Sequence, residues 1–204
     1  MRKRIRKSPP ILEKVFKKQG GILRTMEILS AGIHPRTLYD MKKAGTVETL
    51  HRGVYRLASL PAMEMPDLVV VALRVPKGVV CLTSALSFHR IGTQIPHQIH
   101  VALRQGSERP RIRHIPVKVH WFGGAAFTEG VETHKVDDVA LRVYSVAKTV
   151  ADCFKYRKKI GLDVALEALR EGWKARKCTM DELWKYAKLC RVANVMRPYL
   201  ESLT

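Results

Sequence analysis

The segment Gly20–Leu57 reads GGILRTMEILSAGIHPRTLYDMKKAGTVETLHRGVYRL and contains two short helical patterns followed by two alternating ones. We expect a helix over Arg24–Ala31, where Met26 and Leu29 lie three residues apart on one apolar side. Gly32 favours the end of that helix, because a left-handed backbone conformation costs least at glycine. The pattern is typical of two helices joined by a tight turn.

The second helix is expected over Pro35–Ala44, because proline fits the first helical position and Gly45 follows the last turn. At about 100° per residue, Leu38 and Met41 lie on one side of this helix. The other side carries Arg36, Asp40 and Lys43, and Tyr39 lies between the two sides. A recognition helix in a DNA major groove needs an apolar back and a polar front of this kind. An ordinary amphipathic surface helix is the alternative.

Two strands are expected at Thr46–Leu50 and Gly53–Leu57, because β-branched and aromatic residues alternate there around a turn. Arg52 would lie at the tip of this ribbon and Arg56 on its second strand, where arginines can reach a sugar-phosphate backbone. A further helix over Ile11–Gln19 completes the pattern of a winged helix-turn-helix.

The rest of the chain follows a proline-containing segment at 58–66 that we interpret as a linker. A helix is expected at 67–74, where a run of valines keeps a strand possible. Further elements are expected as strands at 79–82, 99–103, 117–122 and 139–144, and as helices at 85–90 and through most of 145–203. The predicted fold class is α+β, with a larger domain that has a small mixed sheet and a C-terminal helical segment. The predicted parts are a basic arm at 1–10, the winged domain at 11–57, the linker at 58–66 and the α+β domain at 67–204.

The chain carries a net charge of +19, concentrated toward the N-terminus. Residues 1–57 contain fourteen Lys or Arg against four Asp or Glu, and five of these cations lie within Arg2–Lys7. Such a surface favours a polyanionic partner, because neutralised phosphates release condensed counterions. An anionic membrane or ribosomal RNA would satisfy the charge equally well.

The four cysteines show no C-x-x-C spacing, which indicates reduced, mostly buried thiols in a cytoplasmic protein. The longest apolar run, Leu68–Leu73, is far too short to span a bilayer, so no membrane association is expected.

The sequence predicts no catalytic site. Phosphate-binding glycine loops, H-E-x-x-H and G-x-S-x-G are absent from the sequence. His97 and His100 have no nearby acidic or cysteine ligand, and Lys148 and Asp152 are spaced for a structural salt link on a helix. We therefore expect no catalytic residue, no metal and no cofactor. An enzyme that processes nucleic acid remains the alternative, with carboxylates at Asp137, Asp138, Asp152 and Glu167.

Two later segments carry a resemblance to a known family: LTSALSFHRIGTQIPHQIHVAL at 82–103 and VYSVAKTVADCFKYRKKIGLDVALEALREG at 143–172. Together with the ending HRGVYRL of the first segment, they resemble the AbiEi antitoxins of bacterial type IV toxin-antitoxin systems, which act in phage defence. The resemblance implies a repressor that binds inverted repeats in the promoter of its own operon. It also implies a nucleotidyltransferase-like AbiEii toxin as the functional partner, counteracted without a stable complex, and a C-terminal domain associated with antitoxin activity.

The resemblance does not assign DNA contacts, so these come from the helical wheel and the ribbon. The predicted contacts are Arg36, Thr37, Tyr39, Lys42, Lys43, Arg52 and Arg56. Asp40 would accept a hydrogen bond from a cytosine or orient Arg36. A second basic surface is considered at Arg104, Arg109, Arg111 and Arg113, for nucleic acid or a neighbouring protomer, with a solvated loop as the alternative. An RNA-binding module is a third interpretation, but the exposed aromatic residues that it needs are not evident from the sequence.

Overall fold

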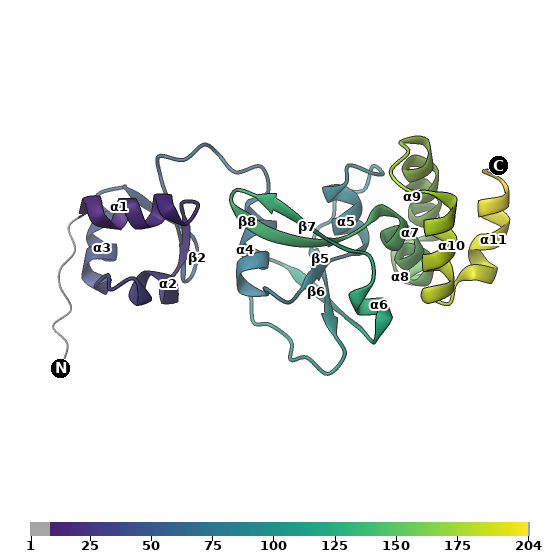
Figure 1. Ribbon diagram of the computed structural model, residues 1–204, viewed down its shortest axis with the longest axis horizontal. Coiled ribbons are helices and arrows are strands. Elements are labelled where there is room, and N and C mark those ends of the chain that lie inside the picture. Colours follow the sequence, from purple (N-terminus) through teal and green to yellow (C-terminus); the bar gives the residue numbers. More distant parts are fainter. Residues whose placement is uncertain (1–8, 204) are drawn as a thin grey trace. The chain divides into compact units, whose positions relative to one another are not determined.

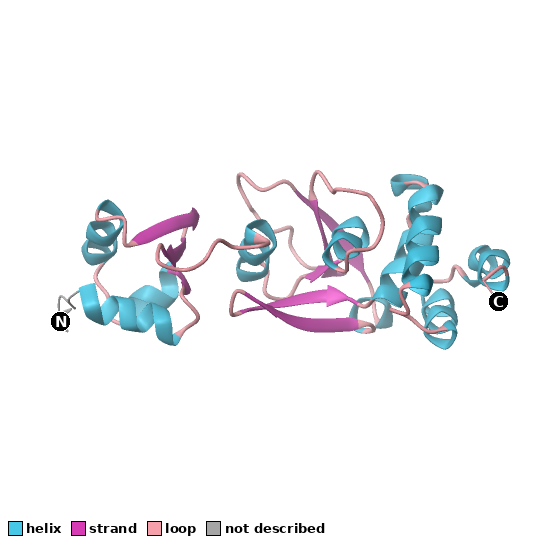
Figure 2. Ribbon diagram, turned by 90° about the horizontal axis from the view of Figure 1, so that it is seen from above, coloured by secondary structure: helices cyan, strands magenta, loops and turns pink. Residues whose placement is uncertain are grey.

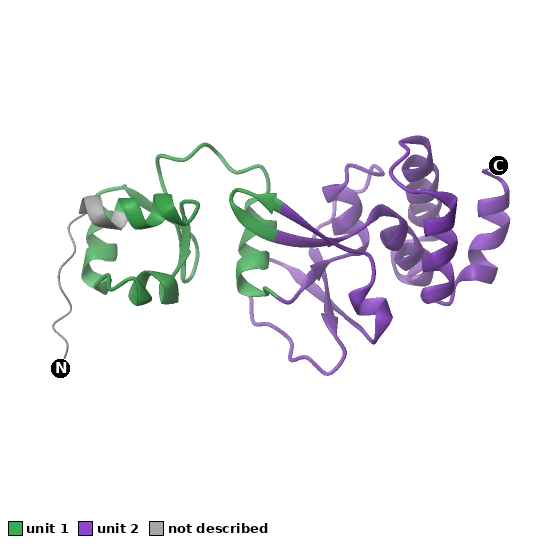
Figure 3. Ribbon diagram, viewed as in Figure 1, with its two compact units in different colours: residues 1–76, 135–140 green, residues 77–134, 141–204 purple. Residues whose placement is uncertain are grey.

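The computed structural model of the chain describes residues 9–203. The described chain forms two compact units, one comprising residues up to 76 with 135–140, the other comprising 77–134 with the remainder from 141 (Figure 3). The basic arm predicted at 1–10 lies outside the described residues as far as residue 8. No helix in the described chain is long and apolar enough to cross a membrane.

The first unit contains the predicted helix-turn-helix and its ribbon (Figure 1). Its elements are α1 (Pro9–Lys18), β1 (Ile22–Arg24), α2 (Thr25–Ser30), α3 (Pro35–Lys43), β2 (Val47–His51), β3 (Val54–Leu57) and α4 (Pro66–Arg74). The apolar sides of the first three helices share one core with the strands, built from Phe16, Leu23, Ile28, Ile33, Leu38, Met41, Val47 and Leu57. The predicted helix at 67–74 is confirmed as α4, and the strand alternative for that segment is wrong.

A third strand distinguishes the observed sheet from the predicted two-stranded ribbon. The strand order is β1-β3-β2, and both neighbours run antiparallel to β3. The helix that we predicted from Arg24 begins at Thr25 instead, because Ile22 and Leu23 are buried in extended conformation against β3. Arg24 ends β1 and caps α2, where its backbone N–H donates to Glu27 Oε2 at 2.7 Å. Strand β3 therefore has a neighbouring strand on each side, where the predicted ribbon gave it only one.

The second unit consists of a mixed sheet followed by helices (Figure 2). Its sheet contains β4 (Val79–Val80), β5 (Ile99–Arg104), β6 (Val117–Phe122), β7 (Val131–Val136) and β8 (Val139–Tyr144), in the order β6-β5-β4-β8-β7. The end of β7 and the start of β8, within residues 135–140, are grouped with the first unit. The helices of the second unit are α5 (Leu82–Phe88), α6 (Ala125–Thr128), α7 (Val146–Lys155), α8 (Arg157–Ile160), α9 (Leu162–Lys174), α10 (Met180–Leu189) and α11 (Ala193–Glu201). The α+β class with a small mixed sheet and a C-terminal helical segment is confirmed.

Two details of the second unit differ from expectation. Strand β7 was not predicted, because its exposed side chains are polar and it lies at the edge of the sheet. Helix α5 begins at Leu82 rather than Ala85, so Thr83 and Ser84 lie inside the helix. Asp137 and Asp138 form the turn between β7 and β8, and both residues are exposed with positive φ.

Helix α7 occupies the centre of the second unit. All of its residues except Lys155 are buried. The core around it includes Val79, Ala102, Phe122 and Tyr144 from the sheet, together with side chains of α5, α9, α10 and α11. The four cysteines are free and buried, as predicted. Burial raises the pKa of the Cys190 thiol to about 12, which keeps it protonated.

Candidate nucleic-acid interface

Local interactions fix both ends of α3. His34 caps the helix, and its Nδ1 accepts a hydrogen bond from the backbone N–H of Arg36 at 3.1 Å. Pro35 occupies the first position, where its missing N–H is not needed. Gly32 and Gly45, with φ of 77° and 70°, make the turns before and after the helix. The side chains of α3 therefore project from a helix whose start and end are well defined.

The two sides of α3 separate as the helical wheel predicts. Leu38 and Met41 are buried in the core of the first unit. Arg36, Tyr39, Asp40, Lys42 and Lys43 are exposed, and Tyr39 is 66% exposed. Lys42 Nζ lies 6.0 Å from the centroid of the Tyr55 ring on β3, which connects the end of the helix to the sheet. The exposed side of α3 thus presents three cations and one aromatic ring.

Thr37 does not lie with these residues. Its side chain is on the buried side of α3, with 9% of its surface exposed. The wheel position of Thr37 is close to the border between the two sides, and the packing of α3 on the core places it inside. We therefore leave Thr37 out of the proposed DNA contacts.

Arg56 is also placed in the interior rather than on the ribbon surface. It lies on the central strand β3, opposite Glu48 on β2 and Ile22 on β1, and is 6% exposed. Its Nη1 donates to Glu48 Oε1 at 2.7 Å, and its Nη2 donates to the carbonyl oxygen of Pro61. These contacts engage both terminal nitrogens of the guanidinium inside the unit, whereas the buried Nε has no hydrogen-bond partner. We therefore assign Arg56 a structural role. The sequence pattern placed Arg56 at the surface because it did not predict β1, the third strand of the sheet.

Arg52 occupies the predicted position at the tip of the ribbon. It is exposed in the turn between β2 and β3, next to Gly53 with φ of 82°. An arginine at such a tip is free of the packing constraints that hold Arg56. The exposed cations of the first unit that fit a polyanion are therefore Arg36, Lys42 and Lys43 on α3 and Arg52 on the ribbon.

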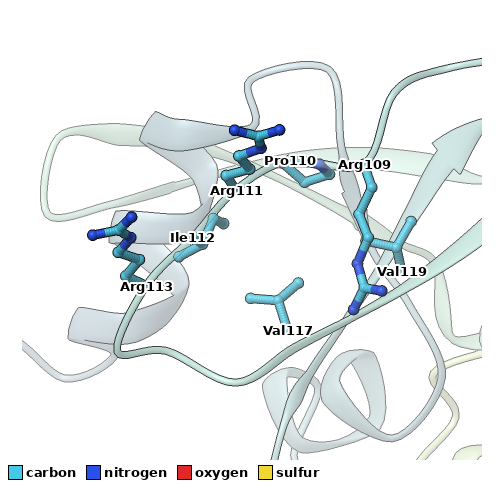
Figure 4. Close-up of a pocket in the computed structure, with 7 residues that line it drawn as sticks. All are labelled: Arg109, Pro110, Arg111, Ile112, Arg113, Val117 and Val119. Carbon is cyan, nitrogen blue, oxygen red and sulfur yellow. The ribbon is translucent and has the colours of Figure 1, made fainter.

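The second basic surface belongs to the segment between β5 and β6. Arg109, Arg111 and Arg113 line a hollow of about 310 Å³ together with Pro110, Ile112, Val117 and Val119 (Figure 4). Arg104 ends β5 and is exposed, but it is not among the residues that line the hollow. Three of the four predicted arginines are thus brought together around an apolar floor.

Other chemistry-bearing residues are engaged in packing or pairing. His100 is buried beside His120, with 3.2 Å between ring nitrogens, and burial lowers the pKa of each to about 4. Glu167 Oε1 accepts hydrogen bonds from the backbone and hydroxyl of Thr93. Within residues 9–203, no group of three or more His, Cys, Asp or Glu side chains is arranged to hold a metal ion.

The succession of helix, strand, two helices and two strands over residues 9–57 defines a winged helix-turn-helix. Residues 10–58 match a family described as "Transcriptional regulator, AbiEi antitoxin", so the N-terminal region carries the domain of that family. No curated protein matches the chain. The chain is similar in fold to the RV2827C protein from Mycobacterium tuberculosis, known from a crystal structure, with 12% identity and a TM-score of 0.57. That likeness covers 91% of this chain and 73% of the other.

The sequence pattern did not predict three residues that contribute to these surfaces. His34 was missed because histidine is not among the usual helix-capping residues. Tyr55 beneath Lys42 depends on the packing of α3 against β3, which sequence spacing does not give. Trp121 has 46% of its surface exposed on β6. The alternation of Val117, Val119 and Trp121 along that strand was a signal that could have identified it.

Proposed function

We propose that this protein is a DNA-binding antitoxin of a type IV toxin-antitoxin system that represses its own operon. The observation that carries the proposal is the exposed side of α3, on a helix whose other side is anchored in a winged fold. The family match over residues 10–58 supports a regulatory role of this kind.

The side chains of α3 and the ribbon divide into two roles in this proposal. Arg36 and Tyr39 read base edges in the major groove, where arginine pairs with guanine through two hydrogen bonds. Lys42, Lys43 and Arg52 contact phosphates, which position the protein without reading sequence. Asp40 lies on the same exposed side, where it accepts from cytosine or orients Arg36 four residues before it.

The operator, the functional partner and the role of the C-terminal unit are proposed from the AbiEi family. We propose inverted repeats in the promoter as the operator, with two copies of the chain bound on DNA, since symmetric half-sites place one recognition helix each. The functional partner would be a nucleotidyltransferase-like AbiEii toxin in the cytoplasm, opposed without a stable complex. The C-terminal unit would supply the antitoxin activity.

Binding of the full chain to its own upstream DNA, compared with a scrambled duplex of equal length, tests the proposal. We expect discrimination between the two duplexes and a steep fall of affinity with salt. Arg36→Ala should weaken operator binding by about 1 to 3 kcal/mol and relax the preference for it, because a base contact is lost.

Lys18→Ala is the matched control, because Lys18 is an exposed cation at the end of α1, outside the proposed contact set. Equal binding of both duplexes would refute operator recognition. An equal loss on both duplexes with Arg36→Ala would demote Arg36 to a phosphate contact.

A further inference from the structure

An exposed aromatic side chain lies on the sheet of the second unit, close to its arginine-rich segment. Trp121 on β6 is 46% exposed, and its Nε1 donates to the carbonyl oxygen of Ser107 at 3.0 Å. This hydrogen bond ties the indole to the start of the segment that carries Arg109 and Arg111. A large apolar ring held in place at the surface is available to a flat ligand.

Alternate residues of β6 extend this surface into an apolar strip. The residues on either side of Trp121 do not belong to the strip, because His120 and Phe122 point toward the Tyr156 ring, at centroid distances of 5.1 and 5.9 Å. Because side chains alternate along a strand, Val117, Val119 and Trp121 point to the opposite side. Strand β6 is also the last strand of the sheet order, so the strip lies at a sheet edge.

Cationic groups border the apolar strip. Arg109 and Arg111 are exposed and line the hollow whose floor includes Val117 and Val119 (Figure 4). The segment from Gln105 to Pro116 carries three arginines against one carboxylate, that of Glu108. Guanidinium groups bind phosphate through paired hydrogen bonds and stack on flat rings. The hollow therefore combines phosphate-binding groups with an apolar floor. Trp121 does not line the hollow but lies two residues beyond Val119, on the same side of β6.

We infer that Trp121, Val119, Arg109 and Arg111 form a binding site for an unpaired polynucleotide strand, separate from the operator-binding helix. A duplex buries the faces of its bases in the stack, whereas an unpaired base exposes its face to an indole. The arginines would hold the phosphates on either side of a base stacked on Trp121. The hollow, at about 310 Å³, is at the lower end of the size range of small-ligand sites, which suits a single base or sugar.

The full chain can be titrated against fluorescently labelled oligo(U) and oligo(dT) of roughly 12 nucleotides, a length within the usual site size. The competitor is a duplex of equal length that lacks the operator. We expect both single strands to bind more tightly than this duplex. The two arms distinguish RNA from DNA, because contacts to the 2′-hydroxyl would favour oligo(U).

Trp121→Ala should weaken single-strand binding about tenfold, whereas Trp121→Phe should retain most of it, because a phenyl ring still stacks. Arg109→Ala combined with Arg111→Ala should lower the slope of log affinity against log salt by about 1.4, as expected for two lost phosphate contacts. The matched control is Lys174→Ala with Lys188→Ala, which removes the same charge from exposed positions on α9 and α10.

Operator binding by the Trp121 variants should equal that of the unchanged protein, and this separates the inference from the proposed function. Thermal unfolding confirms that each variant folds. Three results would overturn the inference: no preference for single strands, affinity unaffected by Trp121→Ala, or the same loss in the lysine control. A failure of operator recognition would leave these measurements intact.

Discussion

Helices α3 and α7 carry the same charge pattern, but the charged residues are exposed in α3 and buried in α7. Each has a cation four residues before an aspartate, Arg36 with Asp40 and Lys148 with Asp152. In α3 both residues are exposed. In α7 they are 0% and 1% exposed, and Lys148 Nζ lies 2.5 Å from Asp152 Oδ2. Spacing along a helix therefore places the partners, whereas the surroundings of the helix decide what the pair does.

The surroundings of the α7 pair explain how two charges remain inside the core. Lys148 Nζ lies 4.2 Å from the centroid of the Tyr144 ring and 4.9 Å from that of Phe122. The Cys190 thiol donates to Asp152 Oδ1 at 3.2 Å. Burial raises the pKa of Asp152, and the charge and hydrogen bond of Lys148 oppose that rise. Lys148 and Asp152 are held by these neighbours, whereas Arg36 and Asp40 are exposed to solvent.

The largest effect on stability is expected from replacing Lys148 on α7. Lys148→Met should lower the free energy of unfolding by about 3 to 5 kcal/mol, because Asp152 is left as an uncompensated buried charge. Urea denaturation measures the change, with Lys155→Met on the exposed end of the same helix as the control. Adding Asp152→Leu to Lys148→Met should recover most of the loss. A loss below about 1 kcal/mol in the single variant would contradict a buried ionic pair.

The buried histidine pair of the second unit should make stability depend on pH. The pKa of His100 and of His120 is lowered to about 4 by burial, with smaller contributions from neighbouring positive charges. The unfolded chain therefore binds more protons than the folded chain between pH 6.5 and 4, so stability falls as pH falls through this window. The slope is at most about 1.4 kcal/mol per pH unit for each histidine.

Urea denaturation at pH 7, 6, 5 and 4 measures the slope of the free energy of unfolding against pH. The double variant His100→Gln with His120→Gln should flatten it over that window. An unchanged slope in the double variant would show that other groups govern the acid response.

A smaller contrast is expected between the two arginines of the ribbon. Arg56→Ala should destabilise the protein by about 1 to 2 kcal/mol, because the Pro61 carbonyl loses its donor while the half-exposed Glu48 regains water. Arg52→Ala should leave stability within about 0.5 kcal/mol and reduce affinity for DNA of any sequence. Thermal unfolding and duplex titration measure the two effects. Equal destabilisation by both variants would place Arg52 in the packed structure as well.

The smallest effect on stability is expected at the exposed α3 pair. Asp40→Asn should change the free energy of unfolding by less than about 0.5 kcal/mol, because water screens both charges. Its effect belongs to DNA binding, where removing one negative charge should raise affinity for a random duplex. A large destabilisation measured by urea denaturation would show that Asp40 supports the fold and would remove the contrast with α7.

Arg56, Thr37 and strand β7 differ from expectation because their positions depend on contacts between distant segments. The alternation of Gly53–Leu57 predicted a strand, but nothing in it showed that Ile22–Arg24 would pair on its other side and bury Arg56. Thr37 lay near the border of the helical wheel, where the exact seating of α3 on the core decides exposure. Strand β7 has a polar sequence, so its pairing at the sheet edge gave no hydrophobic signal.

Local periodicity, caps and turn residues act over a few neighbouring positions, so the amino-acid sequence alone is enough to predict the winged helix-turn-helix, the α+β class and the two sides of α3. Packing between distant elements, in contrast, places Lys148 and Asp152 in the core, turns Arg56 inward and leaves Trp121 at the surface, hydrogen-bonded to Ser107. Burial depends on elements far apart in the chain. A charged or aromatic residue has the same local signature inside and outside, and its role follows from what packs against it.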